Sequence, residues 1–196
     1  MREAEHRVKN NLSLVSSLVN LQASELADPD DRDKMKLVSD RIQSIVLLHE
    51  KLSLSVDLRN IAMRDYLREL IAGIRSTRGD GKPDIKIESD SVDVIFEAKL
   101  ISLLGLIITE LVTNALKYGY PDRIDGLIEV ILDKIDKQDY RLTVRNDGIA
   151  LSDDLDFETP KSLGILLVKK LVEDMDAEMI ITRSPNPSFE ILFRKD

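Results

Sequence analysis

The spacing of apolar residues changes near Asp57, and this change divides the chain into two parts. Over residues 3–27 the apolar side chains recur at the spacing of one face of an α-helix. The proline-containing turn Asp28–Asp31 interrupts this pattern, and a second helical run ends near Asp57. We therefore predict two domains, a helical hairpin over residues 1–57 and a mixed domain over residues 58–196.

The predicted hairpin needs a partner for its apolar faces. Two amphipathic helices joined by a short turn cover only part of their apolar stripes against each other. Pairing of two hairpins into a four-helix bundle would cover the remainder, so we expect residues 1–57 to form a homodimer. The alternative is that the hairpin packs against the second domain of its own chain.

The second domain combines helices with strands. Alternating apolar and polar residues indicate strands, and two such runs flank the polar turn 136–139 as a β-hairpin. The predicted helices cover residues 64–75, 99–118 and 164–174, and the predicted strands cover residues 85–89, 92–96, 127–135, 140–146, 178–184 and 188–194. This order predicts an α+β fold, with a mixed sheet and its helices gathered on one face.

Charge and composition argue against several classes of function. The net charge is -8 at pH 7, whereas a protein that binds nucleic acid generally needs a basic face. The absence of cysteine excludes disulfides, thiolate metal sites and cysteine nucleophiles. The longest apolar run, residues 100–108, is far shorter than the ~20 residues needed to cross a membrane. We therefore expect a cytoplasmic protein that neither binds nucleic acid nor inserts into a membrane.

One of the two histidines lies on the polar side of the first predicted helix. On a helical wheel of ~100° per residue, His6 lies roughly opposite the stripe that contains Val8, Leu12 and Val15. Asn10 shares the side of His6. An exposed neutral imidazole titrates near neutrality and is a competent nucleophile for phosphoryl transfer. The alternative is a surface histidine without a role in chemistry.

The two helical segments are similar to those of a known family. The stretch EHRVKNNLSLVSSLVNLQA resembles the phosphoacceptor helix of sensor histidine kinases, in the branch with the motif H-R-x-x-N-N (the HWE-like, or second HisKA, class). The stretch RIQSIVLLHEKLSLSVDL resembles the second helix of that branch. The resemblance implies that His6 accepts the phosphoryl group, with Asn10 as a further catalytic candidate. Many histidine kinases have an acidic residue directly after the histidine, but here that residue is Arg7, so the preceding Glu5 is the candidate for orienting or deprotonating the imidazole.

A second motif lies on the predicted helix 99–118. Its sequence ELVTNALKYGYPD resembles the N-box of the GHKL (Bergerat) ATPases. Glu110, Asn114 and Lys117 are spaced i, i+4 and i+7, so they share one face of the helix. The resemblance implies that Asn114 ligates Mg²⁺, with Glu110 as a second metal and catalytic candidate, and that Lys117 and Tyr118 contact the nucleotide. These assignments suit the chemistry, because Mg²⁺ takes oxygen ligands and a lysine offsets phosphate charge. The alternative is a solvated helix surface.

The third resemblance covers the segment LTVRNDGIALSDDLDFETPKSLGILLVKKL. In order, it resembles the G1 box, a short ATP lid and the G2 box of the same ATPases. The resemblance implies that Asn146 and Gly148 contact the nucleotide, with a glycine that lets the backbone approach it. It also implies that Ser162, Leu163 and Gly164 bind the nucleotide at the N-terminus of a helix, where anions are favoured.

Two positions depart from the G1 pattern D-x-G-x-G. Asn146 stands where the family has the aspartate that accepts a hydrogen bond from the adenine amino group, and Ala150 replaces the second glycine. An amide oxygen still accepts this bond, but without the negative charge the bond is weaker. Asp147 is adjacent but, on a strand, would point to the opposite face. We therefore expect adenine binding to be weakened by ~1–2 kcal/mol.

Taken together, the resemblances imply a homodimeric histidine kinase core whose ATP-binding domain is a Bergerat-type α/β sandwich. Such a protein would autophosphorylate His6 from ATP with Mg²⁺ and pass the phosphoryl group to an aspartate of a response-regulator receiver domain. One alternative is a degenerate kinase, marked by Asn146 and Ala150, that acts as a dimeric phosphotransfer relay or scaffold without ATP turnover. The other is a GHKL ATPase in which the hairpin only dimerises.

Overall fold

The structure, a computed structural model, describes residues 28, 32, 61–76, 84–121, 125–157 and 163–195. The chain divides into two compact units, Met1–Leu58 and Arg59–Asp196. In the first unit the described residues are Asp28 and Arg32, and the amide of Arg32 donates to the carbonyl oxygen of Asp28 at 3.0 Å. The predicted hairpin and its four-helix bundle lie outside the described residues.

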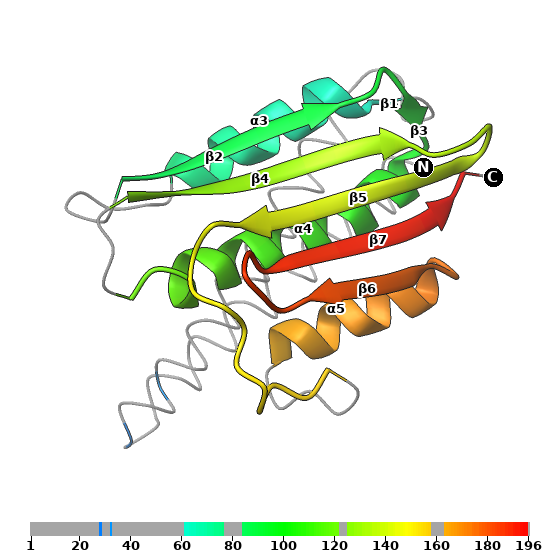
Figure 1. The fold of residues 1–196 in the computed structure, drawn as a ribbon. Helices are drawn as coiled ribbons and strands as arrows, with labels where there is room; N and C mark the ends of the chain where they lie inside the picture. Colours follow the sequence, from blue (N-terminus) through cyan, green and yellow to red (C-terminus); the bar gives the residue numbers. More distant parts are fainter. Residues whose placement is uncertain are drawn as a thin grey trace. The chain divides into compact units, whose positions relative to one another are not determined.

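A five-stranded sheet forms the centre of the second unit (Figure 1). Its strands are β2 (Asp84–Ser91), β4 (Asp125–Lys134), β5 (Asp139–Asn146), β6 (Glu178–Thr182) and β7 (Ser188–Arg194). They lie in the order β2-β4-β5-β7-β6. β2 runs parallel to β4, and all other neighbours are antiparallel. The sheet is therefore mixed, as the sequence predicts.

The described helices of this unit cover one face of the sheet (Figure 1). They are α3 (Met63–Ser76), α4 (Ala98–Tyr118) and α5 (Leu163–Asp174). α4 packs against both α3 and α5, so it is the central helix of the layer. The predicted α+β sandwich with its helices on one face is confirmed.

The core lies between the sheet and the helices. On β5 every second side chain is buried, namely Tyr140, Leu142 and Val144, and these face the helices. The largest fully buried side chains are Phe96, Met63, Leu67, Ile87, Ile101, Leu104, Ile107, Ile108, Leu111, Ile128, Leu132 and Leu142. Each such side chain stabilises the fold by ~1.5–3 kcal/mol through removal of apolar surface from water.

The opposite face of the sheet carries charged side chains that pair across strands. The ion pairs are Arg145–Glu129 at 2.7 Å, Arg194–Asp139 at 3.0 Å, and Arg141 with both Asp133 and Glu190 at 3.6 Å. An apolar inner face and a polar outer face are typical of a sheet with one solvated side.

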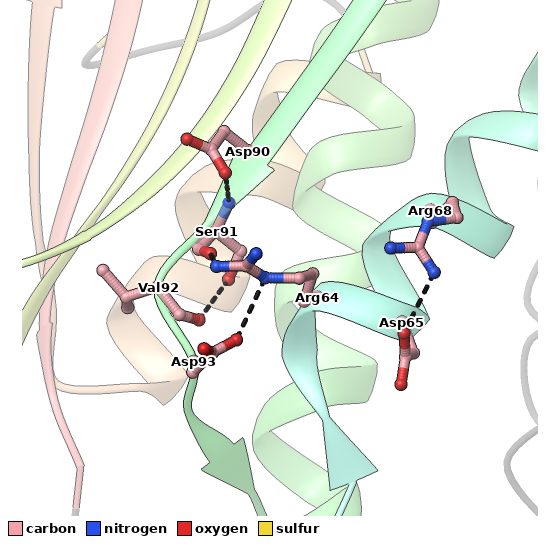
Figure 2. A network of polar contacts seen from close by, with 7 residues as sticks. All are labelled: Arg64, Asp65, Arg68, Asp90, Ser91, Val92 and Asp93. Atoms are coloured by element: carbon pink, nitrogen blue, oxygen red, sulfur yellow. Dashed lines mark hydrogen bonds and ion pairs between the residues drawn. The ribbon is translucent and has the colours of Figure 1, made fainter.

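Two arginine side chains hold α3 along the edge strand β2, and Figure 2 shows the contacts of one of them, Arg64. Arg64 donates to the carbonyl oxygen of Ser91 at 2.6 Å and forms an ion pair with Asp93 at 3.0 Å. Arg75, in the last turn of α3, donates to the carbonyl oxygen of Ile87. Because β2 is an edge strand, carbonyl groups left open there would be available for pairing with another chain. These arginines therefore both dock the helix and protect the edge.

A small second sheet departs from the predicted pattern. β1 (Ile61–Ala62), which the sequence pattern does not predict, pairs antiparallel with β3 (Ile95–Phe96). The strand predicted over residues 92–96 is shortened to β3, because the amide of Val92 still bonds to the carbonyl oxygen of Leu132 at the end of the main ladder. The other helices and strands predicted for residues 58–196 agree with the observed bounds to within two residues.

α4 is unusually apolar for a helix of a sandwich domain. Among the helices of the described part it is the one whose length and composition, from Lys99 to Tyr118, would allow a membrane span. Its central place in the helical layer accounts for this composition, since Ile101, Leu104 and Ile108 along it are fully buried.

Candidate functional site

The end of α4 and the turn after β5 meet at one end of the sandwich. The amide of Ile149 donates to the carbonyl oxygen of Gly119 at 2.9 Å, which joins this turn to the residue that caps α4. Two groups of predicted binding residues, one at positions 114–118 and one at positions 146–148, are thereby brought together from distant parts of the chain.

The predicted polar face of α4 becomes more accessible toward the end of the helix. Glu110 is only 4% exposed, Asn114 is half-buried, and Lys117 and Tyr118 are exposed. The Nζ atom of Lys117 lies 5.0 Å from the centroid of the Tyr118 ring, a cation–π distance. Asn114 and Lys117 are therefore accessible to a ligand. Glu110 is almost fully buried, and its assignment as a second metal and catalytic candidate stays a prediction.

The described residues contain no group of three or more histidine, cysteine, aspartate or glutamate side chains that could hold a metal ion by themselves. This is compatible with Mg²⁺, which is commonly held by one or two side chains together with substrate phosphates. The half-buried side-chain oxygen of Asn114 has the right chemistry for such a ligand.

Asn146 ends β5 on the helix-facing side of the sheet. It continues the alternation of Tyr140, Leu142 and Val144, which all face the helices. Its backbone amide donates to the carbonyl oxygen of Pro187 at 3.0 Å. Its Nδ2 atom is buried and has no hydrogen-bond partner among the described residues. A buried amide without a partner is costly, so this side chain retains capacity for a ligand.

Asp147 has a structural role that the sequence pattern does not reveal. Its Oδ1 atom accepts hydrogen bonds from the amide of Leu127 at 2.8 Å and from the hydroxyl of Tyr120 at 3.0 Å. The Tyr120 hydroxyl has a single proton, which it shares between this carboxylate and the carbonyl oxygen of Leu127, 2.8 Å away. The carboxylate therefore fastens the turn after β5 to β4 and to the residues after α4. No local pattern reveals this contact, because Asp147 lies far along the sequence from both Leu127 and Tyr120.

Gly148 is required by the protein backbone itself. A Cβ atom at this position would collide with the carbonyl oxygen of Gly119 and would lie 2.7 Å from Nδ2 of Asn146. The sequence interpretation assigned this glycine to the approach of a nucleotide. Close packing of the turn against the end of α4 is a sufficient reason for glycine here.

The remaining predicted site residues lie at the start of α5 or outside the described residues. α5 begins at Leu163 and packs against α4 and β6, and Gly164 is buried. The positions outside the described residues are Glu5, His6, Asn10 and Ser162. Their roles stay predictions.

Both parts of the chain match known protein families. Residues 3–78 match the family described as "Histidine kinase", and residues 100–196 match the family described as "Histidine kinase-, DNA gyrase B-, and HSP90-like ATPase". The chain belongs to the histidine kinases. The family that the sequence motifs indicate is thus confirmed, and the second match implies that this histidine kinase binds ATP.

Named relatives of this histidine kinase agree with the assignment. It is 27% identical over 187 residues to "Blue-light-activated histidine kinase 2" of Erythrobacter litoralis, covering 93% of this chain and 53% of the relative. It is 28% identical over 173 residues to "Sensor histidine kinase PdtaS" of Mycobacterium tuberculosis, covering 88% of this chain and 34% of the relative. The chain therefore spans about half or less of the length of these relatives.

A solved structure resembles this histidine kinase over almost its full length. The histidine kinase domain of the Erythrobacter litoralis EL346 blue-light activated histidine kinase matches with a TM-score of 0.72 and 25% identity. The match covers 99% of this chain and 90% of that chain. It supports the sandwich described above as a fold of the same family.

Proposed function

We propose that this histidine kinase binds ATP with Mg²⁺ where the end of α4 meets the turn after β5, and that it transfers the γ-phosphoryl group to His6. The observation that carries the proposal is the contact between two distant segments. The accessible end of α4, with Asn114 and Lys117, adjoins the turn Asn146–Gly148 through the hydrogen bond from Ile149 to Gly119.

Each residue of this site has a distinct role in the proposal. Asn146 accepts a hydrogen bond from the adenine amino group, and Lys117 neutralises phosphate charge with Tyr118 beside it. Asn114 supplies an oxygen ligand to Mg²⁺, which when bound neutralises charge on the phosphates. At the start of α5, the residues that contact the phosphates are Ser162, Leu163 and Gly164.

The chemical step is a transfer from phosphate oxygen to nitrogen. The imidazole of His6 attacks the γ-phosphorus, a P–N bond forms, and the P–O bond to ADP breaks. Asn10 lies on the same side of the predicted helix, and Glu5 is the candidate that orients the ring. Most of the rate enhancement then comes from positioning and charge stabilisation.

The proposal extends to the assembly and to the acceptor of the phosphoryl group. Residues 1–57 dimerise through a four-helix bundle, and residues 58–196 form the ATP-binding domain. The phosphohistidine passes its group to an aspartate on the receiver domain of a response regulator. Membership of the histidine kinase family supports both statements.

Autophosphorylation with γ-labelled ATP and Mg²⁺ tests the proposal. The unmodified chain should acquire acid-labile label, and His6→Ala should abolish it. Because the chain has only two histidines, His49→Ala is the matched control and should keep the label. Label that survives in His6→Ala, or no label in a folded parent chain, would refute the proposed reaction.

The departures at Asn146 and Ala150 favour one second candidate, a phosphotransfer relay without ATP turnover. Calorimetry with a non-hydrolysable ATP analogue and Mg²⁺ separates the two functions. The kinase predicts binding that Asn114→Ala abolishes. The relay predicts no specific binding, with His6 still accepting phosphate from a phosphorylated receiver domain.

A further inference from the structure

The turn between β6 and β7 runs alongside the segment that follows β5. At one end, the amide of Asn146 bonds to the carbonyl oxygen of Pro187 at 3.0 Å. At the other end, the amide of Leu151 bonds to the carbonyl oxygen of Arg183 at 3.0 Å. The β6–β7 turn therefore holds the backbone from Asn146 to Leu151, which belongs to the candidate nucleotide site, by a hydrogen bond at each end.

The side chain of Arg183 extends this support by a two-pronged contact. Its Nη1 atom donates to the carbonyl oxygen of Ser152, and its Nη2 atom donates to that of Leu155, each at 2.7 Å. The amide of Leu155 in turn donates to the carbonyl oxygen of Ser152 at 3.1 Å, so both acceptors belong to one tight turn. A planar guanidinium can hold two such oxygens at once, which a lysine cannot do in the same way.

An aromatic contact ties the same arginine to the core. The Cζ atom of Arg183 lies 5.1 Å from the centroid of the Phe157 ring. That ring packs edge-on against Phe189 of β7, with centroids 5.8 Å apart, and Phe189 is only 9% exposed. Arg183 thus contacts the segment Ile149–Phe157 at three places, two carbonyl oxygens and one ring.

The segment Ile149–Phe157 depends on outside contacts because it contributes little to the core. Ile149 is 54% exposed and Leu155 is 45% exposed, although both are large apolar residues. The segment contains no helix or strand of its own. It begins directly after Gly148, so a shift of its backbone reaches the turn that carries Asn146.

We propose that Arg183 is a positioning residue of the nucleotide site. It holds the segment Ile149–Phe157 against the β6–β7 turn and thereby sets how long a bound nucleotide stays. Arg183 does not contact the nucleotide itself. The inference rests on the proposed ATP site, and it assigns to this site a support that lies outside the family motifs.

Two measurements on Arg183→Ala test the proposal. Without nucleotide, hydrogen exchange at the amides of Leu151 and Leu155 should become faster by about tenfold, the scale of a lost charge-assisted hydrogen bond. With a fluorescent ATP analogue and Mg²⁺, the dissociation rate should rise by about five- to tenfold, with the association rate changed by less than about twofold. Arg183→Lys keeps the positive charge but loses the two-pronged contact. Its exchange and dissociation rates should therefore lie between those of the parent and of Arg183→Ala.

Arg194→Ala is the matched control. Arg194 also lies on the β6–β7 hairpin, but it pairs with Asp139 at the other end of the sheet at 3.0 Å, far along β7 from the candidate site. This variant should leave both rates within about twofold of the parent. Circular dichroism should show that the variants fold. If Arg183→Ala does not fold, the same two measurements are made on Arg183→Lys.

The outcomes distinguish the two proposals. If the parent chain binds nucleotide and the variants exchange faster but release nucleotide at the parent rate, the role of Arg183 is refuted while the ATP site stands. Unchanged exchange in a folded Arg183 variant refutes the role as well. If the parent chain binds no nucleotide, the proposed ATP site itself is refuted.

Discussion

Asn146 and Asp147 are adjacent and similar in size, yet their side chains have different partners. The carboxylate of Asp147 accepts hydrogen bonds from Tyr120 and Leu127. The Nδ2 atom of Asn146 is buried without a hydrogen-bond partner among the described residues. A buried polar group that lacks a partner is destabilising, and such groups are often found where a ligand completes the contact. Of the two, Asn146 is therefore the residue suited to bind a ligand. Its unpartnered Nδ2 atom can donate to an acceptor of the ligand, whereas the bond proposed from the adenine amino group would use its Oδ1 atom.

Asn146→Asp should tighten the binding of an ATP analogue. A carboxylate accepts the hydrogen bond from the adenine amino group more strongly than an amide does, so we expect a gain of ~1–2 kcal/mol, or about tenfold in Kd. Isothermal titration calorimetry with Mg²⁺ present measures it, and Asn146→Ala should weaken binding in the same assay. Unchanged or weaker binding by Asn146→Asp would contradict the assignment of this position.

Asp147→Ala should destabilise the fold without any ligand present. The substitution removes the acceptor of two hydrogen bonds and leaves the amide of Leu127 without that partner, which costs about 2 kcal/mol. Urea denaturation followed by circular dichroism measures the loss. The exposed Asp153 offers a control, because Asp153→Ala should change the free energy of unfolding by less than about 0.5 kcal/mol. Equal midpoints for the two variants would contradict the role given to Asp147.

At the scale of elements, the outer face of the sheet is joined by ion pairs between neighbouring strands. Arg145 of β5 lies directly opposite Glu129 of β4 and donates two hydrogen bonds to its carboxylate, at 2.7 and 3.0 Å. These hydrogen bonds lower the pKa of Glu129, with a further lowering from the charge of Arg145 and an opposing rise from partial burial. The same bonds raise the pKa of Arg145. The pair therefore stabilises the β4–β5 ladder only while Glu129 is ionised.

Glu129→Gln should lower stability at neutral pH but not in acid. Because the pKa of Glu129 is lower in the folded chain than in the unfolded chain, its contribution is complete above the ordinary glutamate pKa of about 4.3. This contribution to stability disappears as the pH falls through the lowered pKa that Glu129 has in the folded chain. The pair is partly exposed to solvent, which screens it, so we expect a difference of at most about 1 kcal/mol at neutral pH. Urea midpoints of parent and variant measured from neutral to acid pH should converge, and parallel curves would contradict this.

At the scale of the whole molecule, the chain consists of two compact units, Met1–Leu58 and Arg59–Asp196. The second unit has a complete core between its sheet and its three helices. The first is expected from the sequence to be a hairpin that covers its apolar stripe by pairing with a second copy. The oligomeric state is therefore a property that the first unit should determine.

Light scattering during size-exclusion chromatography should give a mass of twice the 22.2 kDa chain. Leu12→Asp, on the predicted apolar stripe, should shift the protein toward monomer, because a charge would be buried at the dimer interface. Ser13→Asp is the matched control on the polar side and should stay dimeric. A monomeric parent chain at micromolar concentration would contradict the four-helix bundle and favour packing of the hairpin within its own chain.

The elements of the second unit were largely predictable because their signals are local. The helix at 99–118 and the hairpin strands at 127–135 and 140–146 each repeat an apolar pattern that matches one regular period. The errors fall where tertiary contacts decide. β1 has only two residues, and β3 is shorter than predicted because Val92 stays bonded to the main sheet. Such short pairings have too few residues to show a period.

The candidate site likewise combines features that local patterns predict with features that tertiary contacts determine. The family, the motif residues of α4 and the departure at Asn146 could be predicted from the residue string alone, since these depend on residue types at close spacing. Three other features became visible in the folded chain: Glu110 is buried, Gly148 is needed against Gly119, and Arg183 contacts Ser152 and Leu155. These features could not be predicted, because burial and hydrogen bonding between distant segments depend on how the helices and the sheet pack. A periodic pattern specifies which face of an element is apolar, but it does not specify which residues of another element that face will meet.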